Sequence, residues 1–380
     1  MGPLHGVRVL EMAGIGPAPY CCMVLADMGA EVLRVDRLAP ADLGVPLEAK
    51  YDMMNRNKLS AAIDLKSPEG NAAVLELVRR ADILIEGFRP GVMERLGLGP
   101  ELCFKVKPVL IYGRLTGWGQ DGPLADTAGH DLNYLALSGG LHAFGRKDGP
   151  PAWPLNLVGD FAGGALFLGM GVLAALLEAR ASGKGQVVDA TMIDGVANLM
   201  TMFYGFKQMG IWQTERGVNF IDSGSHFYDV YETSDGKYVT VAAVEKRFYA
   251  ELLERLGLAA ETLPKQNDPK GWDGLRARFA TIFKQKTRDE WCVVFEGSDA
   301  CFAPVLDMDE CVTHPHNAAR GVFQTFDGLV TPSPAPRFSR TPSTLRTGPT
   351  EPGADTDRAL GDWGFSSAQI AALKAAKTIR

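Results

Sequence analysis

Short apolar runs alternate with longer amphipathic stretches along the N-terminal part of the chain. The longer stretches place apolar residues at helical spacing, as in the segment 68–80, where Ser67 is a favoured N-cap and Pro68 suits the first turn. The apolar runs have the length of buried strands. Strands that alternate with helices in this way predict a parallel sheet with helices on both faces. We expect strands at 6–11, 31–36, 60–65, 82–86 and 109–115, and another helix at 20–28.

The pattern changes in the second half of the chain. After a strand at 186–191 and a long helix at 192–209, two strands at 227–232 and 237–244 flank an Asp235-Gly236 pair, which favours a hairpin. A helix is expected at 247–256, and Thr287 and Ser366 begin capping boxes for two others. We therefore predict an α/β fold with a large parallel-sheet domain and a smaller α+β domain over 225–315.

A histidine and two aspartates are the next candidate functional residues. His130 and Asp131 precede a short periodic segment, 132–141, and Asp160 opens a longer apolar helix. At such helix N-termini, free backbone N–H groups and the positive end of the helix dipole favour negative charge. A His and an Asp at two helix ends could pass a proton across a substrate carbon. In the alternative interpretation, Asp160 only caps its helix and His130 is structural.

Basic residues follow three successive strands of the predicted sheet. Arg37, Lys66 and Arg89 come at or just after the ends of these strands. Because the carboxyl ends of parallel strands meet at one edge, the three cations are expected to lie close together. They indicate a site for an anionic ligand, such as a phosphate-bearing molecule.

Composition is that of an ordinary globular protein. The chain has 380 residues, of which 46% are hydrophobic and 22% charged, and its net charge of −6 gives no reason to expect a nucleic-acid partner. The six cysteines form no CxxC pair, so neither zinc nor a disulfide framework is indicated. We expect a cytoplasmic protein without a signal peptide or a peroxisomal address, whose apolar run 161–177 is a buried helix rather than a membrane span.

Several stretches together resemble the alpha-methylacyl-CoA racemase branch of the family III CoA-transferase superfamily. The most specific is the series GWGQDGP, GHD and GDF, which begins at residue 117 and ends at residue 161. Further similar stretches lie at 6–37, 85–100, 156–171, 183–195 and 334–342. The resemblance covers most of the chain.

The resemblance implies an enzyme that acts on acyl-CoA thioesters and uses no metal or redox cofactor, since coenzyme A is part of the substrate. It implies a Rossmann-like large domain over 1–200 that is completed by 330–380, a small domain over 225–315, and linkers at 201–224 and 316–329. It also implies an interlocked homodimer, in which each active site lies between the large domain of one subunit and the small domain of the other.

The resemblance assigns roles to individual residues as well. His130 and Asp160 would match the two acid–base residues, and Glu245 would match the glutamate that pairs with the histidine of a partner subunit. Lys246 and Arg247 stand where relatives more often have Pro and Gln, which adds positive charge beside Glu245. The positions that would line the coenzyme A and acyl site are Arg37, Ile63, Asp64, Leu65, Lys66, Gly87, Phe88, Arg89, Arg95, Gly129, Leu132, Asn133 and Tyr134.

The implied reaction interconverts (R)- and (S)-2-methylacyl-CoA through an enolate. It needs one group on each face of the α-carbon, one acting as base while the other acts as acid. A protonated Asp160 suits this near neutral pH if burial raises its pKa. The backbone N–H of Asp131 is a candidate donor to the enolate oxygen, a contribution worth ~2.7–4 kcal/mol in other enzymes.

Three other functions compete with this one. In a family III CoA transferase, Asp160 would be a nucleophile that forms an acyl anhydride, and the presence of both His130 and Glu245 favours the racemase instead. Gly14 and Gly16 imitate the dinucleotide fingerprint of an NAD-dependent dehydrogenase, but Pro19 replaces its third glycine. A non-enzymatic acyl-CoA carrier gives no reason for the His, Asp and Glu set.

Overall fold

The computed structural model describes residues 2–39 and 47–380, and the contacts within the chain divide it into two compact units. The first comprises Met1–Ser138, Leu155–Leu199 and Gly321–Arg380, and the second comprises Gly139–Pro154 and Met200–Arg320. The segments expected as linkers therefore fall inside the units: 201–224 and 316–320 belong to the second, and 321–329 to the first.

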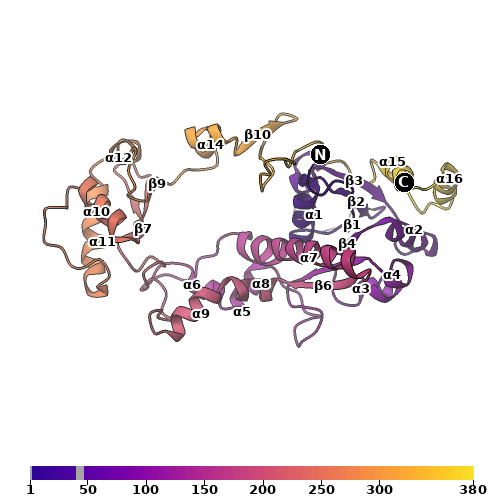
Figure 1. Cartoon of the computed structure of the whole chain (residues 1–380), viewed down its shortest axis with the longest axis horizontal. Coiled ribbons are helices and arrows are strands. Elements are labelled where there is room, and N and C mark those ends of the chain that lie inside the picture. The colour runs from indigo at the N-terminus through magenta and orange to yellow at the C-terminus, as the bar shows by residue number, and fades with distance from the viewer. Residues whose placement is uncertain (1, 40–46) are drawn as a thin grey trace. The chain divides into compact units, whose positions relative to one another are not determined.

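A six-stranded parallel sheet forms the centre of the first unit, with strand order β3-β2-β1-β4-β5-β6 (Figure 1). The predicted α/β class is confirmed. In sheets of this order the strand order reverses between β1 and β4, and ligands bind in the crevice at the carboxyl ends of those strands. The strands are β1 (Arg8–Met12), β2 (Glu31–Asp36), β3 (Lys58–Ala62), β4 (Ile83–Glu86), β5 (Ile111–Thr116) and β6 (Gln186–Thr191).

Each face of this sheet has its own hydrophobic core, because successive strand residues point to opposite sides. Val9 of β1 packs with residues of α1 (Pro17–Asp27) and α7 (Phe167–Ser182). Its neighbour Leu10 lies in the other core, with residues of α2 (Pro68–Arg80) and α15 (Thr356–Asp362) and the fully buried Trp363. The C-terminal segment thus covers one face of the N-terminal sheet.

Shorter elements complete the description of the first unit. The predicted start of α2 is confirmed, since Ser67 Oγ accepts a hydrogen bond from the Gly70 N–H at 3.0 Å. The capping box at Ser366 is confirmed at the start of α16. The further elements are η1 (Ala49–Tyr51), η2 (Met53–Asn55), α3 (Val92–Arg95), α4 (Pro100–Val106), α5 (Asp131–Leu137), α8 (Met192–Leu199), α16 (Ser367–Ala375) and the hairpin of β10 (Phe323–Phe326) and β11 (Leu329–Pro332).

Two predicted helices differ from the observed ones. The expected helix 192–209 is split into α8 and α9 (Thr201–Gln208), because Met200, with φ −80° and ψ 1°, leaves helical geometry where the first unit gives way to the second. The helix expected to open at Asp160 begins at Leu157, with a π-helical segment, η3 (Leu157–Leu166), that runs into α7. Asn156 therefore occupies the N-cap position, and the assignment of Asp160 as N-cap is wrong.

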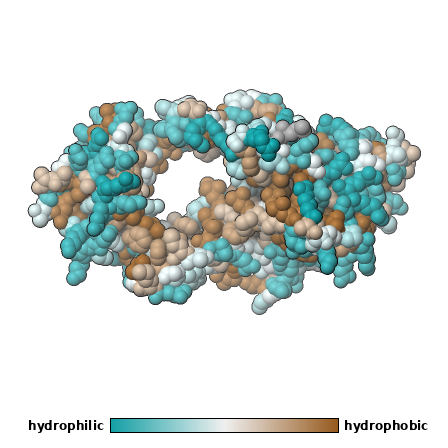
Figure 2. Space-filling view, viewed as in Figure 1, coloured by the Kyte–Doolittle hydropathy of each residue, from teal (hydrophilic) through white to brown (hydrophobic). Residues whose placement is uncertain are grey.

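The continuous segment Leu157–Ser182 is long and apolar enough to cross a membrane by length and composition alone. In the first unit it packs against β5, β6 and α1, and buries Leu168 and Val172 completely. Its other face carries Leu166, Met170 and Leu177 at helical spacing, and these are 48%, 63% and 70% exposed. Figure 2 shows apolar residues gathered at the surface over α7. The segment is thus a core helix with an additional apolar face.

The second unit contains an antiparallel sheet of β7 (Tyr228–Glu232), β8 (Tyr238–Ala242) and β9 (Phe302–Pro304). The predicted hairpin between β7 and β8 is confirmed, and Gly236 adopts the positive φ of 75° that its turn requires. The capping box at Thr287 is also confirmed. Aromatic residues dominate the core of this unit. Its helices include α6 (Gly140–Ala143), α9, α10 (Lys246–Arg255), α11 (Pro269–Phe283), α12 (Arg288–Phe295), α13 (Glu310–Thr313) and α14 (Pro315–Arg320).

Candidate active site

His130 lies at the N-cap of α5, at the end of a loop that is held by two aromatic side chains. Trp118 and Tyr134 pack edge to face, with ring centroids 4.7 Å apart, and the Tyr134 hydroxyl donates a hydrogen bond to the Gly129 carbonyl. A Cβ at Gly129 would lie 2.8 Å from the Tyr134 ring, so only glycine fits there. The His130 N–H donates to Asn133 Oδ1 at 3.0 Å, which closes the first turn of α5. These contacts fix the backbone of His130 and leave its side chain exposed.

Asp160 is half-buried in the first turn of η3, beside the loop that follows β1. Its Oδ2 accepts a hydrogen bond from Asn156 Nδ2 at 3.2 Å. Gly16, the N-cap of α1, is a neighbour of the carboxylate, since a Cβ there would be in van der Waals contact with the same oxygen, at 3.4 Å. Pro17 and Pro19 in the first turn of α1 have no N–H, so this helix end offers few donors to the carboxylate.

The pKa of Asp160 is raised above its ordinary value, chiefly by burial. The negative charge of Asp131 raises it further, whereas the hydrogen bond from Asn156 and the nearby His130 lower it. A carboxyl group in this environment retains its proton at a higher pH than an ordinary aspartic acid. Asp160 can therefore exchange a proton in either direction more readily than an ordinary surface aspartate.

Asp131 connects the two candidate acid–base residues. It is buried at the first position of α5, directly after His130, and its Oδ1 accepts a hydrogen bond from the Asp160 N–H at 2.7 Å. Burial raises the pKa of Asp131, while hydrogen bonds from the Asp160 and Gly159 backbones oppose that rise. Within the described part of the chain, no acceptor binds the Asp131 N–H. A ligand oxygen at that group would displace no hydrogen bond within the described part of the chain.

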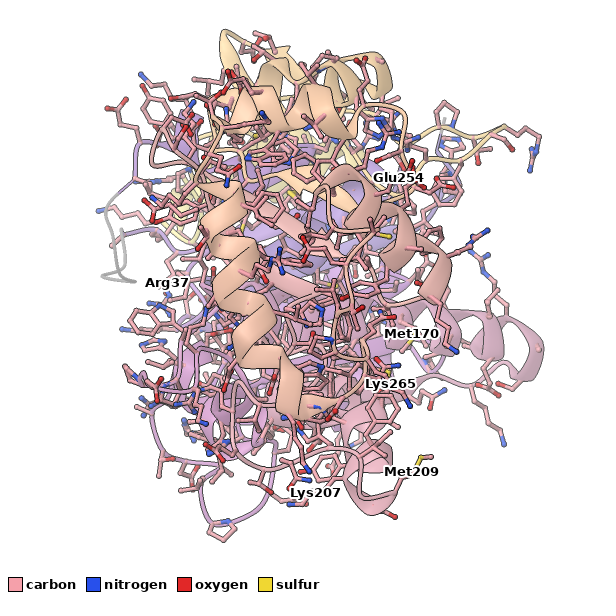
Figure 3. The ribbon with its side chains drawn as sticks, turned by 90° about the vertical axis from the view of Figure 1, so that its left-hand side faces the viewer. Arg37, Met170, Lys207, Met209, Glu254 and Lys265 are labelled. Carbon is pink, nitrogen blue, oxygen red and sulfur yellow. The ribbon has the colours of Figure 1, made fainter. Side chains whose placement is uncertain are left out.

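The predicted cations follow the strands of the first unit, as their positions in the sequence required. Arg37 follows β2 directly and lies at the periphery of the ribbon in Figure 3. Lys66, Arg89 and Arg95 are also exposed, and none of the four forms an ion pair with another of the described residues. The positive charge of Arg89 lowers the pKa of Tyr134, although burial dominates and raises it to about 12. Arg89 is thus close enough to the His130 loop to affect it electrostatically.

The other predicted lining residues differ in what they can present to a ligand. Ile63 is fully buried and forms a β-bridge with Ile379, so only its backbone can face a ligand. Asp64 is tied to the same C-terminal segment, because its N–H donates to the Thr378 carbonyl at 2.8 Å. Leu65, Phe88 and Gly129 are half-buried and Tyr134 is buried, whereas Gly87, Leu132 and Asn133 are exposed.

Glu245 belongs to the second unit, where it occupies the N-cap position of α10 and is exposed. Lys246 and Arg247 begin that helix, and the Arg247 guanidinium lies over the Phe248 ring at 4.3 Å from its centroid. The Arg247 side chain therefore packs against its own helix. The structure thus brings together His130, Asp131 and Asp160 and places Glu245 in the other unit.

Sequence reasoning missed Asn156 and Gly16 as neighbours of Asp160. Asn156 carried a detectable signal, since asparagine is among the favoured N-cap residues and stands just before the apolar helix. The approach of Gly16 had no such signal, because it depends on packing between α1 and η3, which are distant in sequence.

A pocket of about 200 Å³ lies within the second unit. Met200, Phe203, Tyr204 and Trp212 provide its apolar wall, but none of the predicted site residues lines it. Met209, the C-cap of α9, projects away from the ribbon and is 73% exposed (Figure 3). No group of His, Cys, Asp or Glu side chains suited to a metal ion occurs among residues 2–39 and 47–380.

Comparison with known proteins gives extensive matches. The sequence profile of CoA-transferase family III matches residues 4–356. An alpha-methylacyl-CoA racemase of Mus musculus is 45% identical over 97% of this chain and 96% of its own length. An alpha-methylacyl-CoA racemase of Homo sapiens is 43% identical over 99% of this chain and 97% of its own.

Solved structures share the fold as well. The crystal structure of a CAIB/BAIF family protein from Brucella suis superimposes with a TM-score of 0.79 at 24% identity. The superposition covers 95% of this chain and 99% of that protein. At this level of identity the likeness concerns the fold alone.

Proposed function

Because the chain belongs to CoA-transferase family III, we propose that it is a racemase that inverts the α-carbon of 2-methylacyl-CoA thioesters. The observation that carries the proposal is the match to two alpha-methylacyl-CoA racemases over almost the whole chain. The adjacency of His130, Asp131 and Asp160 supports the proposal, because these residues can supply the acid–base groups that a racemase needs.

In the proposed reaction, His130 and Asp160 act on opposite faces of the α-carbon. For one enantiomer His130 removes the α-proton, and Asp160, in its protonated form, returns a proton to the other face. For the other enantiomer the roles are exchanged. The raised pKa of Asp160 supports this use, because both of its protonation states are then accessible closer to neutral pH.

The enolate that forms between the two transfers carries its charge on the thioester oxygen. The Asp131 N–H is the candidate donor to that oxygen, since it lies at a helix start and has no acceptor among the described residues. A donor that is held in place before the reaction stabilises the developing charge without reorganisation. No group besides the substrate's own coenzyme A is required for these steps.

The exposed cations of the first unit are proposed to bind the coenzyme A moiety. Arg37, Lys66, Arg89 and Arg95 suit phosphate groups, because guanidinium and ammonium groups form charge-assisted hydrogen bonds with phosphate oxygens. The backbone of Ile63 and the residues around Gly87 and Gly129 would line the same ligand.

We further propose that the enzyme is an interlocked homodimer, in which Glu245 of the partner subunit orients His130. The exposed apolar face of the segment Leu157–Ser182, with Leu166, Met170 and Leu177, supports burial against a second chain. We propose a cytoplasmic location because all six cysteines are free, three of them buried, and thiols stay reduced in the cytosol.

Isotope exchange tests the proposed reaction directly. The purified protein is incubated in D₂O with separate (R)- and (S)-2-methylacyl-CoA, and deuterium at the α-carbon is measured by mass spectrometry. We expect incorporation from either enantiomer together with inversion, and a loss of ~10²–10⁴-fold in racemisation for His130→Ala and for Asp160→Ala. Normal racemisation by His130→Ala would contradict the role of the histidine. Transfer of coenzyme A to a carboxylic acid without α-exchange would identify a transferase with Asp160 as nucleophile.

A further inference from the structure

We infer that the Asp131 side chain is a positioning residue that holds the Asp160 backbone at a fixed distance from His130. The inference rests on the proposed function for its catalytic meaning, but the contact itself does not. It assigns to the Asp131 carboxylate a task that is separate from the one proposed for its backbone N–H.

The contact is short and built into the packing. Asp131 Oδ1 accepts from the Asp160 N–H at 2.7 Å, and the whole residue is only 8% exposed. A Cβ at Gly159 would lie 2.2 Å from the same oxygen, so glycine is required for the carboxylate to reach this backbone. A charge-assisted hydrogen bond of this kind, shielded from water, is stronger than one between neutral groups.

The position of Asp131 in the chain makes this contact relevant to both acid–base residues. His130 precedes it by one peptide bond, and the His130 backbone is itself fixed by Asn133 through a 3.0 Å hydrogen bond. One side chain therefore joins the start of α5 to the first turn of η3. Movement of either helix relative to the other would break the bond.

The separation of the two helices matters because the proposed reaction needs a group on each side of one carbon atom. A displacement of about 1 Å in such a site can lower the rate about 10²-fold. The charge of Asp131 has a second effect, since it contributes to the raised pKa of Asp160 after the larger contribution of burial. Substitutions can separate the effect of the hydrogen bond on the position of Asp160 from the effect of the Asp131 charge on its pKa.

The test compares three variants with a control. Asp131→Ala removes the acceptor, and Gly159→Ala displaces the carboxylate while leaving Asp131 in place. Asp131→Asn keeps an acceptor oxygen and removes the charge. Asp126→Ala, at an exposed aspartate of the preceding loop, is the control. Amide hydrogen exchange of the peptide that contains Asp160 is measured together with kcat and KM for a 2-methylacyl-CoA.

We expect Asp131→Ala and Gly159→Ala to accelerate exchange at the Asp160 amide and to lower kcat about 10²-fold, with KM changed less than about threefold. Asp131→Asn should keep most of the protection and of kcat, and its rate profile should shift to lower pH on the acidic side. If Asp131→Ala does not fold, Gly159→Ala decides in its place.

Unchanged amide protection in the folded Ala variants would overturn the inference, and so would a kcat within threefold of the wild type. The exchange measurement stays decisive even if the wild type racemises nothing. In that case the proposed function fails, and the structural link between Asp131 and Asp160 is judged on protection alone.

Discussion

At the scale of single residues, the environment of Asp160 predicts the acidic limb of the pH–rate profile. In either direction of racemisation, one of the two acid–base residues must be free of its proton while the other carries one. Both directions therefore lose activity when the two groups are protonated together, and the rate rises as pH increases through a pKa above that of an ordinary aspartate. Initial racemisation rates of each enantiomer from about pH 4 to pH 9 measure this limb.

Asn156, which donates a hydrogen bond to Asp160, offers a substitution that tests this prediction. It stabilises the carboxylate form of Asp160 and so lowers the pKa. Asn156→Ala should therefore move the rising limb to higher pH without removing either acid–base group. An unmoved limb in Asn156→Ala would contradict the assigned role.

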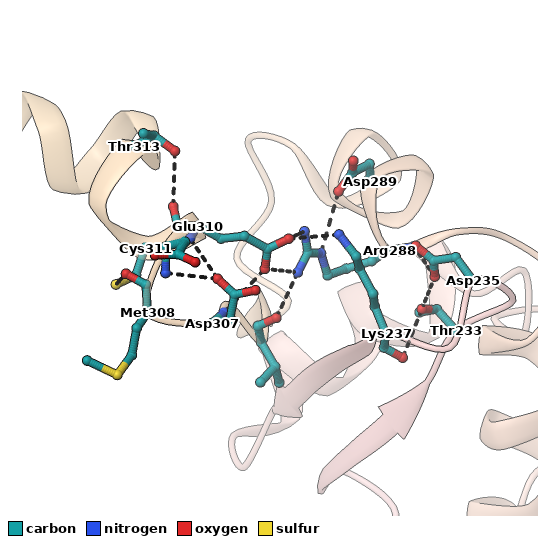
Figure 4. Close-up of polar contacts among 12 residues, drawn as sticks. Thr233, Asp235, Lys237, Arg288, Asp289, Asp307, Met308, Glu310, Cys311 and Thr313 are labelled. Atoms are coloured by element: carbon teal, nitrogen blue, oxygen red, sulfur yellow. Dashed lines mark hydrogen bonds and ion pairs between the residues drawn. The ribbon is translucent and has the colours of Figure 1, made fainter.

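At the scale of elements, a cluster of charged residues in the second unit ties α13 to α12 and to the hairpin (Figure 4). Arg288 donates to both oxygens of Glu310, at 2.6 and 2.7 Å, and Lys237 Nζ donates to Oε1 at 2.7 Å. The hydrogen bond from Arg288 is the largest of the effects that lower the pKa of Glu310. The charged form of Glu310 is therefore favoured in the folded state.

A lowered carboxylate pKa stabilises the fold above the ordinary glutamate pKa, and the effect is lost as pH falls through the folded value. Glu310→Gln should lower the melting temperature at neutral pH and weaken its dependence on acid, because Arg288 loses its bidentate partner. Thermal unfolding followed at several pH values measures this. Glu296→Gln, at an exposed glutamate of the same unit, is the control. Equal melting temperatures for wild type and Glu310→Gln would show that the cluster is not stabilising.

Elements with strong local signals were predictable, and contacts between distant segments were not. Ser67 and Pro68 indicated the start of α2, and Thr287 that of α12, because capping depends on neighbouring residues. The interruption at Met200 had no signal, since methionine is a good helix former and the break coincides with a change of unit. His130 and Asp160 were identified by resemblance, but the hydrogen bond through Asp131 joins α5 to η3 and depends on their packing.

At the scale of the whole molecule, the proposed shared site predicts complementation between inactive variants. His130→Ala and Glu245→Ala would each inactivate both sites of a homodimer. In a mixed dimer, one site carries both changes and the other carries neither, so co-expression should restore about one quarter of wild-type activity if subunits pair at random. Activity of the co-purified dimer, compared with each variant alone, is the measurement.

The control pairs His130→Ala with Asp160→Ala, two changes in the first unit. Both residues of a site then come from the same chain, and co-expression should restore nothing. Recovery with Glu245→Ala that is no greater than in this control would contradict a site shared between subunits.

The first unit is built from three separate segments of the chain, and this limits the order in which the protein can fold during translation. Ala359, Leu360 and Trp363 cover one face of the sheet, yet the ribosome makes them after all of the second unit. Until then, Leu10, Leu33 and Leu84 lack part of their packing. The aromatic core of the second unit lies between residues 227 and 300 and can form earlier. The nascent chain therefore presents a partly uncovered apolar sheet face, of the kind that chaperones bind, for as long as the second unit takes to be synthesised.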